Sequence, residues 1–253
     1  MKIIESAKND WIKQIKKLEK KKFRDLENRY LIEGEHLVEE ALNYGGDIQF
    51  ILVTEESLPS YAYLLEKIEE DKKVQVTYEV IKHLSTLPSP QPIMAIVGKV
   101  NKIATTRATS HVLLLDNVQD PGNVGTMIRT ADAAGFSKVV LGKGTADVYS
   151  PKVVRSMQGS QFHIKLEETE LIETIAGLRE EAYQIYGTEL NEEAISFKDI
   201  EKSEKIAILM GNEGQGVSAD LLKETDQNIF IPMKGHAESL NVAVAAGIVM
   251  FSL

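Results

Sequence analysis

Residues 206–216 read Ile-Ala-Ile-Leu-Met-Gly-Asn-Glu-Gly-Gln-Gly and join an uninterrupted apolar run to a glycine-rich loop. A short apolar run without polar alternation is typical of a strand buried on both faces, as in a parallel sheet covered by helices. Glycines directly after such a strand leave backbone groups open to a ligand. The stretch therefore predicts an α/β sheet with a binding loop at the carboxyl end of this strand.

Two other stretches have the same form. Residues 117–129 (Asn-Val-Gln-Asp-Pro-Gly-Asn-Val-Gly-Thr-Met-Ile-Arg) follow the apolar run 112–115, and residues 231–241 (Ile-Pro-Met-Lys-Gly-His-Ala-Glu-Ser-Leu-Asn) follow the run 228–231. Ligands of open α/β sheets bind outside the carboxyl ends of the strands. We therefore expect the three loops to form one composite site.

Strands and helices alternate along two parts of the chain, and in residues 110–253 this alternation favours a parallel sheet covered on both faces. We expect a small α/β domain at residues 1–100, a polar linker at 101–109, and a larger domain at 110–253. In the first domain we expect helices at 10–22, 33–43 and 61–70 and strands at 30–32, 49–53, 74–77 and 93–97. In the second we expect strands at 112–115, 139–141, 184–187, 206–210 and 228–231 and helices at 123–135, 152–157, 171–181 and 239–252.

The composition excludes several kinds of chemistry. The 253 residues contain no cysteine, so disulfides, thiolate nucleophiles and cysteine-bound metals are excluded. The five histidines show no ligand spacing, and we expect no metal. No apolar run reaches the roughly 18 residues of a membrane span, and the first residues lack the apolar core of a signal peptide. We expect a soluble, cytoplasmic protein with no membrane partner.

The net charge of −9 is unevenly distributed. Residues 1–30 hold ten Lys/Arg and five Asp/Glu, a local charge of +5, so the remaining residues carry −14. A basic segment on an acidic body permits contact with phosphates. A lysine-rich helix that is merely solvated explains the same pattern.

The three loops carry residues suited to positioning and charge stabilisation: Asn123, Arg129, Glu213, Ser239 and Asn241. Arg129 would lie early in a helix, where a cation opposes the helix dipole, which suggests a phosphate clamp. Pairing with Asp132 would also explain it. Glu213 would ordinarily be solvated, and Ser239 and Asn241 would ordinarily cap a helix. Together the set suits positioning and electrostatic stabilisation rather than covalent or metal catalysis.

The three stretches resemble the motifs of the SpoU (TrmH-like) family of RNA 2′-O-ribose methyltransferases in the SPOUT superfamily. The motifs are Asn-x-Gly-x-x-x-Arg at 123–129, Gly-Asn-Glu-Gly-x-Gly at 211–216, and Ile-Pro-Met followed by Glu-Ser-Leu-Asn-Val-x-x-Ala within 231–245. The resemblance covers roughly residues 110–253, without departures at the motif positions. Residues 1–98 more weakly resemble the RNA-binding domain that precedes the catalytic domain in rRNA-modifying members.

The resemblance implies an α/β SPOUT domain whose parallel sheet contains a deep trefoil knot, preceded by a small α/β substrate-binding domain. It implies S-adenosyl-L-methionine as the cofactor, RNA as the partner and a homodimer formed through the catalytic domain. The expected reaction is methyl transfer to a ribose 2′-hydroxyl, with 23S ribosomal RNA favoured. A tRNA 2′-O-methyltransferase and a catalytically silent RNA-binding or assembly protein are the alternatives. A dinucleotide-dependent oxidoreductase is disfavoured because the glycine spacing differs from Gly-x-Gly-x-x-Gly.

The resemblance also assigns roles to single residues. Arg129 is the expected central catalytic residue, with Asn123, Glu213, Ser239 and Asn241 beside it. The residues expected to hold the cofactor are Met210, Gly211, Asn212, Gly216, Ile231, Met233 and Leu240. The residues expected to contact RNA are Lys13, Lys16, Lys20, Lys21 and Arg24.

Overall fold

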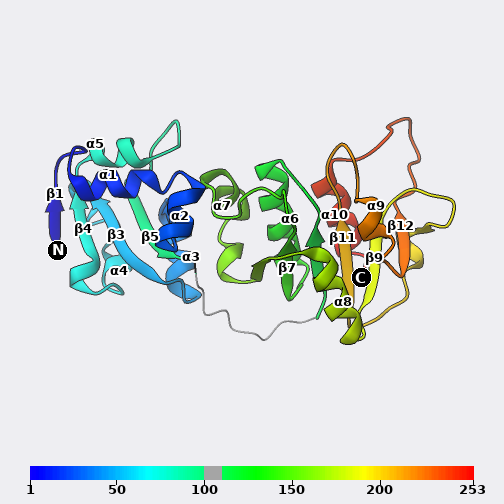
Figure 1. Ribbon diagram of the computed structural model, residues 1–253. Helices are drawn as coiled ribbons and strands as arrows, with labels where there is room; N and C mark the ends of the chain where they lie inside the picture. The colour runs from blue at the N-terminus through cyan, green and yellow to red at the C-terminus, as the bar shows by residue number, and fades with distance from the viewer. Residues whose placement is uncertain (100–109) are drawn as a thin grey trace. The chain divides into compact units, whose positions relative to one another are not determined.

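The chain forms two compact units in a computed structural model that describes residues 1–99 and 110–253 (Figure 1). Of these residues, the first unit comprises 1–99 and 149–162, and the second comprises 110–148 and 163–253. The linker expected at 101–109 lies outside the described residues. The return of residues 149–162 to the first unit is a feature that the sequence did not indicate.

The first unit is a five-stranded sheet with helices. Its strand order is β1-β4-β3-β5-β2, and β5 pairs antiparallel with both β3 and β2. The strands are β1 (Lys2–Ile4), β2 (Arg29–Glu33), β3 (Ile48–Thr54), β4 (Lys73–Val76) and β5 (Ile93–Gly98). The helices are α1 (Asp10–Lys17), α2 (Lys21–Glu27), α3 (Glu35–Asn43), α4 (Ala62–Leu65), α5 (Tyr78–Leu84) and α7 (Pro151–Met157).

The single helix expected at 10–22 is two helices. Asn9 caps α1 by accepting a hydrogen bond from the N–H of Trp11 at 2.9 Å. The chain becomes extended at Lys20 before α2 begins. Arg24 of α2 donates to the carbonyl of Leu18 at 2.6 Å, which satisfies a backbone group left free where α1 ends. The buried hydrogen bond from Arg24 therefore stabilises the break between α1 and α2.

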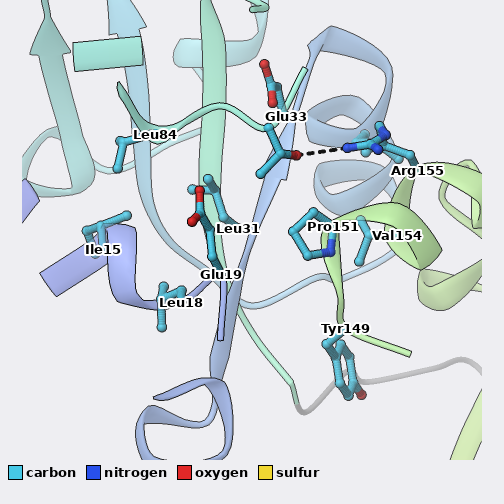
Figure 2. Close-up of a pocket in the computed structure, with 12 residues that line it drawn as sticks. Ile15, Leu18, Glu19, Leu31, Glu33, Leu84, Tyr149, Pro151, Val154 and Arg155 are labelled. Atoms are coloured by element: carbon cyan, nitrogen blue, oxygen red, sulfur yellow. Dashed lines mark hydrogen bonds between the residues drawn. The ribbon is translucent and has the colours of Figure 1, made fainter. Parts of the chain in front are cut away.

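Residues 149–162 pack onto the first unit through several specific contacts. Tyr149 donates its hydroxyl proton to the carbonyl of Lys99 at 3.1 Å, and its ring packs on Tyr30. Arg155 of α7 donates to the hydroxyl of Thr86 at 2.9 Å. Figure 2 shows Pro151, Val154 and Arg155 on one side of a small crevice, with Ile15 of α1, Leu31 of β2 and Leu84 of α5 among the other residues that line it.

The second unit is built on seven strands that all pair in parallel, as the sequence predicted. Their order is β10-β12-β9-β11-β6-β7-β8. The strands are β6 (Val112–Leu115), β7 (Lys138–Leu141), β8 (Lys165–Glu168), β9 (Gln184–Thr188), β10 (Ile195–Ser196), β11 (Ile206–Met210) and β12 (Gln227–Phe230). The helices are α6 (Pro121–Ala133), α8 (Leu171–Glu180), α9 (Ala219–Leu222) and α10 (Val242–Met250). The deep trefoil knot stays a prediction.

Helix starts differ from those expected at two functional loops. The helix expected to begin at residue 123 begins at Pro121. Asp120 caps it by accepting from the N–H of Asn123 at 2.9 Å, and Pro121 occupies the first helical position, where no N–H is needed. Asn241, not Ser239, caps α10 by accepting from the N–H groups of Ala243 and Val244. As a result, Asn123 lies in the first turn of α6 and Asn241 lies directly before the first residue of α10.

Among residues 1–99 and 110–253, no helix combines the length and apolar character that a membrane crossing needs.

The buried His111 makes the stability of the second unit depend on pH. Its Nδ1 accepts a hydrogen bond from the N–H of Ile206 at 3.3 Å, and its ring meets Phe136 edge-on. Burial lowers the pKa of His111 below its usual 6.5. As the pH falls below 6.5, the imidazole of His111 takes up a proton in the unfolded chain but not in the native state. The free energy of unfolding therefore decreases as the pH falls.

We predict that His111→Gln reduces the loss of unfolding free energy between pH 7.5 and pH 5.5, measured by urea denaturation at both values. His83→Gln, which removes an exposed histidine of α5, is the matched control and should follow the wild type. An unchanged pH dependence in His111→Gln would show that His111 does not titrate differently on folding.

Candidate active site

The carboxyl ends of β9, β11 and β12 border one cavity of about 300 Å³. That volume lies at the lower end of the range for small-molecule sites, roughly 300–1,000 Å³. The lining residues are Thr188, Glu189, Leu190, Met210, Gly211, Asn212, Glu213, Gly216, Ile229, Phe230, Ile231, Met233, Glu238, Ser239, Leu240, Val242, Ala245 and Val249. All seven residues expected to hold the cofactor are among them.

The loop after β11 is a tight hairpin. Asn212 and Gly216 exchange two backbone hydrogen bonds, each of 2.9 Å, and Gly216 has φ +71°. The side-chain oxygen of Asn212 accepts from the N–H groups of Gly214 and Gln215. Gly211 lies so close beneath the hairpin that a Cβ atom built on it would be 2.1 Å from the carbonyl carbon of Gly216. The backbone, more than the side chains, therefore sets this wall of the cavity.

Glu213 ties this hairpin to the loop before α6. Its carboxylate accepts hydrogen bonds from the N–H of Gln119 at 3.2 Å, the N–H of Asp120 at 3.1 Å and Nδ2 of Asn123 at 3.0 Å. Partial burial raises the pKa of Glu213, but these hydrogen bonds together outweigh it, so the pKa lies below its usual 4.5. The side chain is therefore an anion at neutral pH and acts as a positioning group between two loops.

Asn123 connects Glu213 to the third loop. Its Oδ1 accepts from Nδ2 of Asn241 at 2.9 Å, while its own Nδ2 donates to Glu213. Asn241 uses its Oδ1 to cap α10. The order Glu213–Asn123–Asn241 thus joins residues that lie as many as 118 positions apart in the sequence. Three of the expected catalytic residues form one hydrogen-bonded row.

Arg129 lies exposed on α6, at a distance of six positions from Asn123 along the chain. The alternative of an Arg129–Asp132 pair does not occur, because Asp132 binds Nδ1 of His163 at 2.8 Å. Within the described parts of the chain, Arg129 forms no ion pair. Its guanidinium is therefore available to an anion from outside.

The remaining expected catalytic residue, Ser239, lines the cavity itself together with Glu213. Asn123, Arg129 and Asn241 are not among the lining residues. The hydrogen-bonded row begins at Glu213 on the cavity wall, passes through Asn123 of α6 and ends at Asn241, whose neighbours Leu240 and Val242 line the cavity. The arrangement combines a cavity for one small molecule with an adjoining polar surface for a second molecule.

The basic residues of the first unit have different surroundings. Lys13 pairs with Asp10, Lys16 with Glu19 and Lys21 with Asp25. Lys20 is exposed. Exposed pairs of this kind are worth roughly 0–1 kcal/mol, so a phosphate could replace the carboxylates at little cost.

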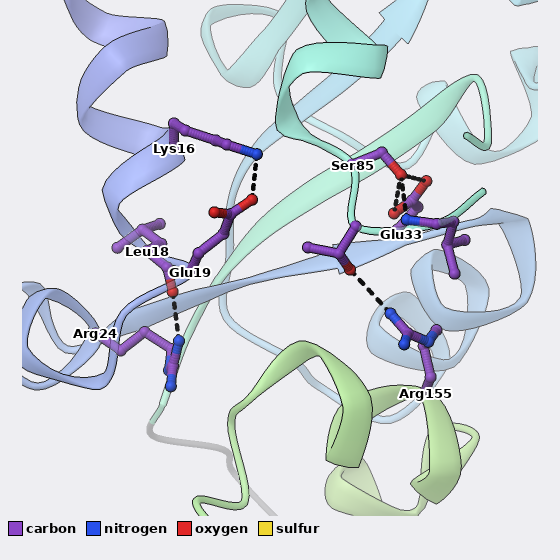
Figure 3. Close-up of polar contacts among 9 residues, drawn as sticks. Lys16, Leu18, Glu19, Arg24, Glu33, Ser85 and Arg155 are labelled. Atoms are coloured by element: carbon purple, nitrogen blue, oxygen red, sulfur yellow. Dashed lines mark hydrogen bonds and ion pairs between the residues drawn. The ribbon is translucent and has the colours of Figure 1, made fainter. Parts of the chain in front are cut away.

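Arg24 is a correction to the predicted RNA contacts. Its side chain is only 2% exposed, and its guanidinium donates inward to the carbonyl of Leu18, as Figure 3 shows. A buried guanidinium that holds the turn between two helices is not presented to an RNA phosphate. The sequence showed only that Arg24 belongs to a basic run and could not show which way it points.

Sequence reasoning missed the residues that β9 contributes to the cavity, Thr188, Glu189 and Leu190. Thr188 donates its hydroxyl proton to the carbonyl of Leu209 at 2.9 Å, which fixes the end of β9 against β11. The position of these residues at the carboxyl end of an expected parallel strand was the available signal. The order of the strands, which brings β9 between β11 and β12, was not readable from the sequence.

The lining residues fit an adenosyl sulfonium cofactor, as the resemblance implies. Met210, Ile229 and Ile231 offer an apolar wall for a flat base, and the hairpin offers backbone groups. Three carboxylates, of Glu189, Glu213 and Glu238, line the cavity, and its described wall contains no Lys or Arg. A cationic ligand therefore suits the cavity better than a phosphate-bearing one.

We predict that Gly211→Ala destabilises the protein by roughly 1–3 kcal/mol, because the added methyl group forces the hairpin backbone to move. Urea denaturation measures the change. Gly214→Ala is the matched control, since a Cβ atom there would approach no described atom closer than 3.7 Å. Equal stability of the two variants would show that the hairpin yields without cost.

Comparison with known proteins agrees with this geometry. A sequence model of the SpoU rRNA Methylase family matches residues 110–251, and one of the MRM3-like substrate binding domain matches residues 9–95. The 23S rRNA (guanosine(2553)-2′-O)-methyltransferase RlmP of Bacillus subtilis (strain 168) is 46% identical over 261 residues, covering 100% of this chain and 99% of that protein.

Solved structures give the same result. The AdoMet-bound rRNA methyltransferase from Sinorhizobium meliloti superposes with a TM-score of 0.88 at 32% identity, over 99% of this chain and 96% of that chain. The A. aeolicus TrmH/SpoU tRNA modifying enzyme superposes with a TM-score of 0.53 at 30% identity, over 58% of this chain and 74% of that chain. The SpoU match and the full-length likeness assign the protein to a family: this chain is a member of the SpoU rRNA methylase family.

Proposed function

We propose that the protein transfers a methyl group from S-adenosyl-L-methionine to a guanosine ribose 2′-hydroxyl of 23S ribosomal RNA. The observation that carries the proposal is the row Glu213–Asn123–Asn241, which links the cavity to a helix bearing the exposed Arg129. The likeness to the Bacillus subtilis enzyme, whose name specifies a 23S rRNA guanosine 2′-O position, supports this substrate.

The cofactor, when bound, supplies a methyl group already activated by a sulfonium, so the chain's task is alignment and proton removal. The residues we propose to hold it are Met210, Gly211, Asn212, Gly216, Ile231, Met233 and Leu240. Backbone groups of the hairpin and of the loop after β12 provide polar contacts without charged side chains. Ser239, on the same wall, faces the cavity from the third loop.

Arg129 is proposed to clamp a phosphate of the RNA beside the reacting ribose. A guanidinium remains protonated at all physiological pH values, so it serves as a cation rather than as a base. It stabilises negative charge that develops on the 2′-oxygen as the proton leaves. Asn123 and Asn241 fix the first turn of α6 relative to the cavity, which sets the place from which Arg129 reaches the RNA.

The first unit is proposed to bind the RNA. Residues 9–95 match a substrate-binding domain model, and Lys13, Lys16, Lys20 and Lys21 lie in its basic segment. The tRNA-modifying relative superposes on 58% of the chain, whereas the rRNA-modifying relatives cover nearly all of it. Ribosomal RNA is therefore favoured over tRNA. We propose the cytoplasm as the site of the reaction by analogy with the Bacillus subtilis relative.

We further propose a homodimer formed through α10. The side chains of Val244, Ile248 and Phe251 are 52%, 37% and 66% exposed and recur at helical spacing on one side of the helix. An apolar stripe of this kind is costly in water and marks an interaction site. A second copy of the chain would cover it by a contact of identical surfaces.

We predict that Arg129→Ala abolishes methylation of 23S rRNA by the purified protein with labelled cofactor, lowering the rate at least about 100-fold. The rate falls because the variant lacks the guanidinium that we propose to bind the RNA phosphate. Arg129→Lys should retain little activity because an ammonium cannot form a bidentate contact with phosphate. Arg179→Ala, which removes an exposed arginine of α8, is the matched control and should stay within about threefold of the wild type.

The proposed substrate can be tested by mapping the 2′-O-methyl positions of rRNA from cells with and without the gene. The mark should disappear from one guanosine of 23S rRNA and return with the wild-type gene but not with Arg129→Ala. Loss of a tRNA mark instead, or a full rate in Arg129→Ala, would contradict the proposal.

We predict that Ile248→Glu converts the dimer to a monomer at micromolar concentration, measured by analytical ultracentrifugation, because a charge would be buried without a partner. Ile172→Glu on α8, where the isoleucine is 53% exposed, is the matched control and should leave the mass unchanged. A wild-type protein that sediments as a monomer would refute the dimer itself.

A further inference from the structure

Glu189 is a half-buried carboxylate on the wall of the cavity. It follows β9 directly, and its N–H donates to the carbonyl of Ile229 at 3.1 Å, which fixes its backbone between β9 and β12. A Cβ atom built on Gly216 would lie 3.7 Å from a carboxylate oxygen of Glu189, so the side chain reaches the hairpin after β11. With residues 1–99 and 110–253 considered, the carboxylate has no hydrogen-bond or ion-pair partner.

The three carboxylates that line the cavity differ in their hydrogen-bond partners and in their exposure to water. The oxygens of Glu213 accept three hydrogen bonds from the loop before α6 and are committed to holding it. Glu238 is exposed, so water can solvate it. Glu189 combines partial burial with free acceptor capacity, and an unpaired anion in that position gains stability when a ligand supplies donors.

The place of Glu189 indicates which ligand donors would meet it. The apolar wall of Ile229, Ile231 and Met210 suits the base, and the reacting end must lie toward Glu213 and Asn123. The ribose connects these two parts of an adenosyl ligand. Its vicinal hydroxyls present two adjacent donors, which match the two oxygens of one carboxylate. The same chemistry operates where an acidic residue binds a ribose in dinucleotide-binding folds.

We propose that Glu189 is a specificity-determining residue that selects the ribose of the adenosyl cofactor, its carboxylate accepting hydrogen bonds from the two hydroxyls. The inference rests on the proposed function, since it concerns the same cavity. It adds a role to β9, which none of the three motif-bearing loops includes.

Isothermal titration calorimetry with the full-length protein tests the assignment. The ligands are 5′-methylthioadenosine, which has the ribose but no amino-acid part, its 2′-deoxy analogue, and S-adenosylhomocysteine. The wild type should bind 5′-methylthioadenosine about tenfold or more tightly than the 2′-deoxy analogue, because hydrogen bonds to a charged group are strong. Glu189→Gln should bind it about tenfold more weakly than the wild type and reduce the preference to threefold or less.

Glu192→Gln is the matched control, because it removes the same charge three positions along the chain at an exposed site. It should keep the wild-type preference, and all three proteins should melt at the same temperature without ligand. This second measurement separates a lost contact from a damaged fold.

Three results would overturn the assignment to the ribose. Glu189→Gln could bind every ligand like the wild type, or it could retain the full preference over the deoxy analogue. It could also lose affinity for S-adenosylhomocysteine alone, which would place the carboxylate against the amino-acid ammonium. A wild type that binds none of the three ligands would instead refute the proposed cofactor, and this outcome is distinct from a failure at Glu189.

Discussion

Parallel pairing of β11 with β6 on one side and β9 on the other is the constraint on which the site depends. The register places Met210 opposite Leu115 and Leu209 opposite Gly187, so the three strands end at nearly the same height. All five residues of β11 are buried, which holds the pairing in place. The loops that follow these strands have little freedom to lie elsewhere.

Hydrogen bonds between the loops then fix the loops relative to one another at the carboxyl edge of the sheet. The carboxylate of Glu213 collects two backbone N–H groups and the amide of Asn123, and Asn123 in turn accepts from Asn241. These residues are better described as positioning groups than as reacting ones, since their polar atoms are already committed to one another. Arg129, by contrast, is exposed on α6 and forms no ion pair within the described residues.

The acidic cavity and the basic N-terminal segment differ in charge, which matches the two ligands that we propose for them. The cavity wall carries three carboxylates, which suits a cationic cofactor, while residues 1–30 carry a net +5, which suits RNA. Residues 149–162 belong structurally to the first unit, through Tyr149 on Tyr30 and Arg155 on Thr86. The chain thus enters the first unit twice, and the family motifs contain no sign of the second entry.

The sequence predicted the parallel sheet of the second unit, its strands β6, β9, β11 and β12 within one residue at each end, and the residues that line the cavity from the second and third loops. Continuous apolar runs and glycine-rich loops are local signals, so they can be read along the chain. It missed α5, although Thr77 accepts from the N–H of Val80 and so supplies an N-terminal cap, and it missed β8, whose residues are too polar to mark a buried strand.

What the sequence by itself determined is the set of elements and the chemistry of the three loops, because these follow from side-chain periodicity, turn residues and motif spacing. What only the tertiary structure decided is which polar groups meet. It assigned Asp132 to His163 and left Arg129 free, turned Arg24 inward, and brought Glu189 to the cavity through the strand order. The physical reason is that hydrogen-bond partners and burial depend on strand order and helix packing, which bring together residues from different elements and leave no trace in the local sequence pattern.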